Sequence, residues 1–226
     1  MSRPHRSCPA GFVFHVLNRA IARARIFADP DDFSAFESLL AAAVARVRTR
    51  LLAYCVMSNH WHLVIWARTD RDVSAFAHWL SHRHARAFHE KRGTTGSGHV
   101  YQGRFKSFPV QTDAHFFRLC AYVEGNPIRA GLVSRAEEWP AGSARRRDGR
   151  DARLSAMLHE WPLERPPEWR EFVNHLLSPA DLEEIRNSVR RGRPLGAEAW
   201  RKEVTSRLGL EATSRGPGRP RKPPVP

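Results

Sequence analysis

Cysteine, tyrosine and long apolar runs are all scarce in this 226-residue chain. Its three cysteines, Cys8, Cys55 and Cys120, are far apart and never stand in Cys-x-x-Cys spacing. Neither a disulfide framework nor a zinc ribbon fits such a set, which is typical of a reducing compartment. The first residues form no apolar signal-peptide core, and no apolar run approaches the length of a membrane span. We therefore expect a soluble, cytoplasmic protein without a membrane partner.

Acidic side chains are also in deficit. The chain has 37 Lys and Arg against 23 Asp and Glu, a formal net charge of +14. The excess is segregated, because residues 1–133 hold 18 basic and 9 acidic side chains, residues 134–184 hold 8 and 11, and residues 185–226 hold 11 and 3. A GC-rich genome would explain the preference for Arg over Lys but not the net sign or its segregation. This balance favours a polyanionic partner, first of all nucleic acid, and a nucleoid-associated location.

Hydrophobic periodicity predicts alternating strands and helices over residues 1–133. We expect strands at 11–17, 51–56, 61–66 and 100–110, the last broken near Gly103, and helices at 29–49, 72–91 and from 113 to Pro127. Asp29 followed by Pro30 is typical of a helix start. The order β-α-β-β-α-β predicts an α+β protein with the ferredoxin-like split βαβ arrangement, in which helices lie on one face of an antiparallel sheet.

The remainder of the chain predicts a mostly helical C-terminal extension and a basic tail. Residues 134–178 are rich in Pro, Arg and Trp and lack periodicity until a short helix near 169–177, so we interpret them as a linker or extension. Helices at 179–190 and 197–208 predict a DNA-binding extension over 179–210. Residues 211–226 cannot form a core and are expected to be disordered alone. Residues 1–133 would then form the main domain.

His60 and His62 flank Trp61 on a predicted strand, so both imidazoles point to one side of it. Two imidazoles on a rigid strand are half of a metal site, although this spacing alone fits two satisfied core histidines equally well. Tyr122 and Asn126 stand four apart on a predicted helix and share a face. If that helix packs beside the histidines, two imidazoles and an amide oxygen would form a three-ligand site, open to a phosphate oxygen and water.

These motifs and others resemble the REP-associated tyrosine transposases, single-tyrosine members of the HUH endonuclease superfamily. His60-Trp61-His62 matches the histidine–hydrophobic–histidine signature of that superfamily. The other matching segments are 14–19, 57–62, 102–107 and 122–132, and the segments 192–196 and 218–222 are similar to the tail of the family. The resemblance covers most of the chain in the right order and fades across residues 135–165.

The resemblance implies that Tyr122 is the nucleophile and that His60, His62 and Asn126 bind a divalent metal, Mg²⁺ or Mn²⁺. It implies a metal-dependent single-strand DNA endonuclease and strand transferase, which cleaves and rejoins at repetitive extragenic palindromic hairpins through a 5′-phosphotyrosine intermediate. The alternative is a domesticated hairpin-binding protein that does not cut. A third hypothesis, a relaxase or replication initiator, shares the chemistry but usually has a larger chain. Both a monomer and a homodimer stay open.

Basic residues near these motifs are candidate DNA contacts. They are Arg104, Lys106, Arg129, Arg193, Arg219, Arg221 and Lys222. Ordinary surface charge explains each of the first three equally well. The segment 218–222 resembles an AT-hook core, although phosphate attraction by a disordered tail explains it as well. The histidine-rich helix at 72–91 lacks a zincin pattern and favours a solvated or DNA-facing surface over a second metal site.

Overall fold

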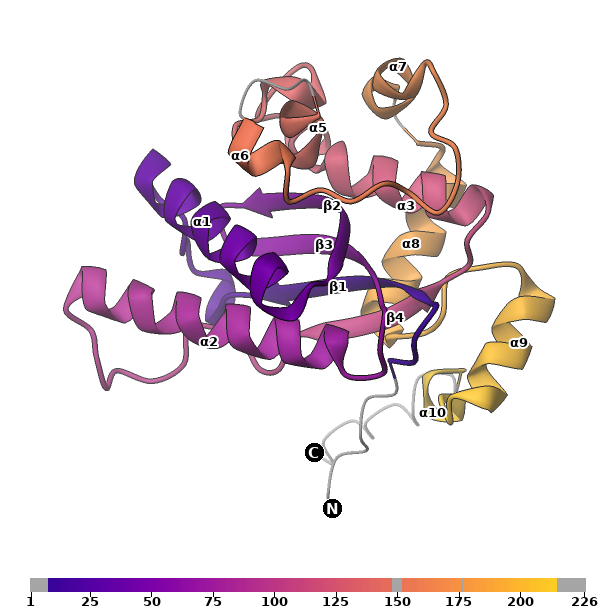
Figure 1. Ribbon diagram of the computed structural model, residues 1–226, viewed down its shortest axis with the longest axis horizontal. Coiled ribbons are helices and arrows are strands. Elements are labelled where there is room, and N and C mark those ends of the chain that lie inside the picture. The colour runs from indigo at the N-terminus through magenta and orange to yellow at the C-terminus, as the bar shows by residue number, and fades with distance from the viewer. Residues whose placement is uncertain (1–7, 148–151, 176, 215–226) are drawn as a thin grey trace, which may run out of the picture.

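The computed structural model describes residues 8–147, 152–175 and 177–214 (Figure 1). One antiparallel sheet has the strand order β2-β3-β1-β4, with β1 at Val13–Arg19, β2 at Arg50–Met57, β3 at His60–Trp66 and β4 at Lys106–Val110. Helix α1 (Pro30–Val47) joins β1 to β2, and α2 (Asp72–Arg92) joins β3 to β4. This order in sequence and space is the split βαβ arrangement, so the predicted ferredoxin-like α+β fold is confirmed.

Both faces of the sheet are buried. Because side chains alternate along a strand, Phe14 and Trp61 pack in the core beneath α1 and α2, whereas Val13 and Val64 pack in a second core. Helix α3 (Ala114–Glu124) supplies much of that second core, together with residues from the segment that follows it. Helices α1 and α2 therefore lie on one face of the sheet as expected, whereas α3, also predicted as a helix, packs on the other face (Figure 1).

The remaining elements are short, apart from two helices near the C-terminus. They are η1 (Ile21–Arg23), α4 (Asn126–Arg129), η2 (Ala136–Glu138), α5 (Ser143–Arg146), α6 (Ala152–Ser155), α7 (Trp169–Asn174), α8 (Pro179–Arg191), α9 (Glu198–Arg207) and α10 (Glu211–Ser214). The strand expected over 100–110 is confined to β4, and Tyr101 forms only an isolated bridge to Ala20. Among the described residues, no helix is long and apolar enough to cross a membrane.

Described residues of the segment 134–178 cover the free edge of β2. The indole N–H groups of Trp139 and Trp161 donate to the carbonyl oxygens of Val56 and Leu52, both at 2.9 Å. The opposite edge, at β4, is covered by Leu195, whose amide donates to the Pro109 carbonyl at 3.0 Å. An exposed strand edge is a template for unwanted pairing, so these later segments protect the sheet. The division of the chain into four segments stays a prediction.

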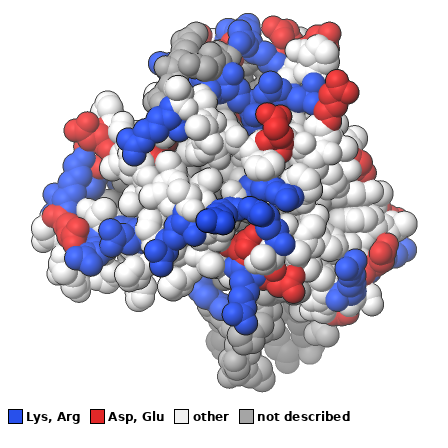
Figure 2. All heavy atoms as spheres, in the orientation of Figure 1, with Lys and Arg blue, Asp and Glu red and all other residues white. Residues whose placement is uncertain are grey.

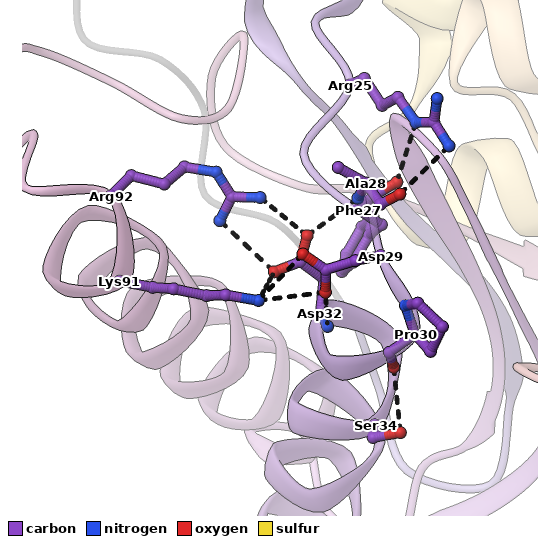
Figure 3. A network of polar contacts seen from close by, with 9 residues as sticks. All are labelled: Arg25, Phe27, Ala28, Asp29, Pro30, Asp32, Ser34, Lys91 and Arg92. Carbon is purple, nitrogen blue, oxygen red and sulfur yellow. Dashed lines mark hydrogen bonds and ion pairs between the residues drawn. The ribbon is translucent and has the colours of Figure 1, made fainter.

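A buried carboxylate joins the start of α1 to the end of α2 (Figure 3). The side chain of Asp32 is 4 % exposed and accepts hydrogen bonds from the Ala28 amide at 2.8 Å, Lys91 Nζ at 2.8 Å and Arg92 at 2.7 Å. Burial by itself would raise the pKa of Asp32, but the bonds from Arg92, Lys91 and the Ala28 amide hold that pKa well below its usual range.

Replacing Asp32 with Asn is expected to lower the free energy of unfolding at pH 7 by about 2 kcal/mol, because Lys91 and Arg92 lose their shared partner. The pKa of Asp32 is lower in the folded protein than the value of about 3.9 in an unfolded chain. Its contribution is therefore fully present above that value and is lost as the pH falls through the folded-state pKa. Urea unfolding from pH 7 to pH 3 should show a smaller loss of stability in Asp32→Asn than in the wild type. Equal losses would contradict this assignment.

Candidate active site

The central strand β3 presents His60 and His62 to the face of the sheet that α3 covers. Their ring centroids lie 5.0 Å apart with the rings nearly perpendicular. Trp61 points to the opposite face, where it is fully buried and its indole N–H lies 3.0 Å from Tyr101 Oη. The alternation expected of a strand thus places both imidazoles side by side beneath α3.

Each imidazole has one nitrogen held by the protein. His62 Nδ1 lies 2.8 Å from His15 Nε2, and His60 Nδ1 lies 2.6 Å from Asn59 Oδ1. When His62 donates its Nδ1 proton to His15, its Nε2 is left with a free lone pair, and the same holds for His60 donating to Asn59. Both histidines can therefore offer Nε2 to a cation.

His15 lies in the matching segment 14–19, but the sequence analysis assigned it no role at the site. It is fully buried on β1, with its ring centroid 4.9 Å from that of His62. Its own Nδ1 is buried without a hydrogen-bond partner among the described residues. Its place in that segment was a signal in the sequence, but its position beside His62 depends on the register between β1 and β3.

Burial keeps all three imidazoles neutral near pH 7. It lowers the pKa of His15 to about 3, and burial together with the nearby charge of Arg19 lowers the pKa of His60 to about 4. The pKa of His62 lies well below its usual value, first because of burial and then because of the neighbouring His15 and His60. Neutral imidazole is the form that ligates metals, so burial favours that role.

Tyr122, near the end of α3, lies against this histidine group. Its ring centroid is 5.9 Å from that of His62 and 6.3 Å from that of His15, and it meets both rings edge to face. The residue is partly exposed. Its phenol ring therefore contacts the imidazoles while part of the side chain reaches the surface.

The other two tyrosines of the chain are core residues. Tyr54 is fully buried and donates its hydroxyl proton to Glu37 at 2.5 Å, and Tyr101 is 7 % exposed and hydrogen-bonded to Trp61. Burial raises the pKa of both phenols above its ordinary value. Of the three tyrosines, Tyr122 alone combines access to solvent with a position beside the imidazoles.

The chain breaks its helix between Tyr122 and Asn126. The prediction that one helix carries both residues is wrong, because α3 ends before Gly125 and Asn126 begins α4. Pro127 has no N–H to continue the helical hydrogen bonds. Gly125 is required for close packing here, since a Cβ at this position would lie 2.9 Å from the Ala121 carbonyl oxygen. The buried Nδ2 of Asn126 has no hydrogen-bond partner within the described part of the chain.

The donor set fits a divalent cation in its chemistry. His60 and His62 are neutral imidazoles with oriented rings, and the Asn126 Nδ2 has no hydrogen-bond partner among the residues that the structure describes. In the ranges that the structure describes, no three His, Cys, Asp or Glu side chains are grouped as a metal site. A metal site with three protein ligands at this place would therefore need the side-chain amide of Asn126 besides His60 and His62.

Residues 10–126 match the family model of the IS200-like transposases, and this range contains both histidines, Tyr122 and Asn126. The chain belongs to the IS200-like transposase family. Its fold is similar to a solved structure of a REP-associated tyrosine transposase bound to a REP hairpin, with a TM-score of 0.53 and 18 % identity over 66 % of this chain and 87 % of that one. The resemblance inferred from the sequence motifs is thus confirmed.

A second solved structure, a putative transposase from Deinococcus radiodurans R1, matches with a TM-score of 0.38 and 16 % identity over 51 % of this chain and 89 % of that one. No curated protein sequence matches the chain.

Arg129 of this transposase lies over the proposed nucleophile. Its guanidinium carbon is 4.3 Å from the centroid of the Tyr122 ring, and its terminal nitrogen donates to the backbone carbonyl of Tyr122. Burial lowers the pKa of Arg129, while the neighbouring Tyr122 opposes that effect. The structure therefore brings Arg129 to the site as a support for Tyr122, and a contact between Arg129 and phosphate stays a prediction.

The other basic candidates are more dispersed. Arg104 is exposed beside a groove of about 920 Å³ along α2, Lys106 donates to the Val189 carbonyl at 3.2 Å, and Arg193 has a buried Nε without a partner in the described chain. Arg219, Arg221 and Lys222 lie outside the described residues. Figure 2 shows Lys and Arg side chains spread across the face of the molecule that carries α1 and α2. Positive charge is therefore not confined to the side of the sheet that α3 covers.

Proposed function

We propose that this transposase is a metal-dependent single-strand DNA endonuclease and strand transferase in which Tyr122 is the nucleophile. The observation that carries the proposal is the position of Tyr122. It is the tyrosine of this chain that lies against His62 and His15 and is also partly exposed, while Tyr54 and Tyr101 are core residues. A tyrosine that serves only to fill the core would need neither the imidazoles nor access to solvent.

The reaction proposed for Tyr122 is a transesterification. Its phenol oxygen attacks the phosphorus of a phosphodiester, a bond forms between that oxygen and phosphorus, and the bond from phosphorus to the 3′-oxygen breaks. The phenol proton is released and the departing 3′-oxygen takes up a proton, so a 3′-hydroxyl and a 5′-phosphotyrosine result. Attack by that hydroxyl, or by one from another strand, reverses the step without ATP.

The surrounding residues support this step in separate ways. Arg129 stacks on the Tyr122 ring and bonds its backbone carbonyl, which orients the phenol. His15 holds the ring of His62 in one orientation. A divalent cation, Mg²⁺ or Mn²⁺, held by His60, His62 and Asn126 would stabilise the negative charge that develops on the phosphate.

A single-stranded DNA hairpin of the REP type is the proposed substrate. The solved transposase of similar fold is bound to a REP hairpin, and the net charge of +14 on this chain suits a polyanion. The alternative of a hairpin-binding protein that does not cut is less well supported, because binding alone requires neither the two imidazoles nor an adjacent phenol.

End-labelled hairpins test this function. The transposase is incubated with Mn²⁺ and a REP-type hairpin that carries single-stranded flanks and a label at either its 3′ or its 5′ end. We expect a protein–DNA band that survives denaturation and carries only the 3′ label, because the tyrosine keeps the 5′-phosphate of the downstream fragment. The 5′-labelled fragment should end in a 3′-hydroxyl that a polymerase extends. Binding without any adduct would instead support the alternative, and an adduct bearing the 5′ label would contradict the proposed polarity.

A further inference from the structure

The loop between β1 and α1 has an exposed apolar tip among arginines. Residues 21–25 are all exposed, and Ile21 is 51 % exposed, one of three large apolar side chains in the described chain with such exposure. Arg19, Arg23 and Arg25 flank this tip, and the first acidic residue of the sequence is Asp29. An apolar side chain between cations suits a nucleic acid, which offers flat bases next to phosphates. We name residues 19–25 the Ile21 loop.

The Ile21 loop begins at the proposed active site. Arg19 is the register partner of His60 across the β1–β3 pair, and cross-strand partners project from the same face of a sheet. DNA whose scissile phosphate lies at the histidines would therefore run past this loop.

Asn59 ties the Ile21 loop to His60. Its backbone carbonyl accepts from the Ala20 amide at 2.9 Å, its Nδ2 donates to the Arg23 carbonyl at 3.2 Å, and its Oδ1 lies 2.6 Å from His60 Nδ1. The Ile21 amide donates to the Val100 carbonyl at 3.0 Å. One asparagine thus fixes both a proposed metal ligand and the loop beside it.

The far end of the loop is fixed as well. The guanidinium of Arg25 donates to the carbonyl oxygens of Phe27 at 3.4 Å and Ala28 at 3.2 Å (Figure 3). Ala28 is in turn held by Asp32 at the start of α1. Hydrogen bonds therefore hold both ends of the loop, while the residues between Ala20 and Arg25 are exposed.

The backbone of the tip is strained. Ala22, with φ 49° and ψ 20°, and Arg23, with φ 58°, are successive residues in the left-handed region, which side chains with a Cβ disfavour. Neither position is glycine, the residue that would adopt this conformation most easily. Strain of this kind persists where the surrounding contacts impose it, and it is concentrated at ligand-binding and catalytic sites.

We propose that the Ile21 loop is a DNA wedge, an inference that rests on the proposed function. Ile21 packs against a base in the single strand next to the scissile phosphate and separates it from its neighbour, while Arg19 and Arg23 contact the adjoining phosphates. The wedge would hold the strand in an unstacked conformation, with the phosphate exposed to Tyr122.

Fluorescence of 2-aminopurine tests the wedge. The probe is a REP-type hairpin with 2-aminopurine placed in turn at each position of its single-stranded flanks, bound to Tyr122→Phe protein so that no cutting occurs. We expect a fluorescence rise at one flank position, because the base is unstacked, and we expect Ile21→Ala in the same background to abolish that rise while changing hairpin affinity less than threefold. In the protein with Tyr122 intact, Ile21→Ala should slow adduct formation about tenfold.

Leu132→Ala is the matched control, because Leu132 is an isomer of Ile21 with the same 51 % exposure. It should leave both the fluorescence and the adduct rate unchanged. Wild-type fluorescence and rate in Ile21→Ala, or an equal loss in Leu132→Ala, would overturn the wedge. If the wild-type protein forms no adduct yet the Ile21-dependent fluorescence rise is present, the proposed function fails and the wedge stands. If an adduct forms at the same rate in Ile21→Ala, the wedge fails and the proposed function stands.

Discussion

Tyr122→Phe is expected to form no covalent adduct with hairpin DNA, a loss of at least about a thousandfold, while its DNA affinity stays within about twofold of the wild type. The substitution removes one oxygen and keeps the ring between His62 and Arg129. Since the missing oxygen is the proposed nucleophile, neither the imidazoles nor a bound cation can replace it. Denaturing gels of 3′-labelled hairpin measure the adduct, and gel shifts without metal measure binding.

The two core tyrosines provide controls for this experiment. Tyr54→Phe and Tyr101→Phe should keep the adduct, because neither phenol is placed to reach a phosphate. Tyr54→Phe should lower the free energy of unfolding by about 1–2 kcal/mol, because the buried Glu37 loses a hydrogen-bond donor. An adduct that persists in Tyr122→Phe, or disappears in a well-folded Tyr101→Phe protein, would contradict the assignment of the nucleophile.

His62→Ala is expected to abolish Mn²⁺-dependent cleavage, because it removes a central ligand of the proposed site.

His15→Phe should weaken Mn²⁺ binding without abolishing it. Phe occupies a similar volume in the buried position of His15, but it leaves His62 Nδ1 without its partner. Loss of such a supporting hydrogen bond typically weakens metal affinity about 10–100-fold. Titration of Mn²⁺ followed by calorimetry measures that affinity independently of cleavage.

The control for this pair is thermal unfolding without metal, in which His15→Phe should resemble the wild type within a few degrees. Wild-type Mn²⁺ affinity in His15→Phe would show that His62 needs no partner to hold its orientation. Undiminished Mn²⁺-dependent cleavage in His62→Ala would remove the imidazole pair from the mechanism.

Much of the fold could be predicted from local patterns. The alternation around Trp61 and the cap at Asp29 are short-range features, and both predict the elements that the structure contains. The segment 134–178 could not be assigned in this way. Trp139 and Trp161 attach it to an edge strand through indole hydrogen bonds, and Ala141 and His159 do so through isolated backbone bonds. Such scattered contacts leave no hydrophobic period in the sequence.

The candidate site was only partly predictable for a related reason. His15, His60, His62 and Tyr122 all belong to matching segments, but the hydrogen bond from His15 to His62 depends on the register between β1 and β3. Pro127 signalled that the helix ends nearby, but not that it ends before Asn126. The close approach of Gly125 to the Ala121 carbonyl requires coordinates. In the sequence, Asn59 is only a turn residue between two strands. Its contacts with Arg23 and His60 are seen only in the structure.

The most direct test of the proposed active site identifies the residue that carries the DNA. Wild-type protein is allowed to react with a REP-type hairpin and Mn²⁺, digested with protease and nuclease, and analysed by mass spectrometry. We predict a nucleotide attached through its 5′-phosphate to the peptide that contains Tyr122. A nucleotide on any other residue, or none at all from a protein that binds the hairpin and Mn²⁺, would contradict the claim that the phenol of α3 and the imidazoles of β3 form one active site.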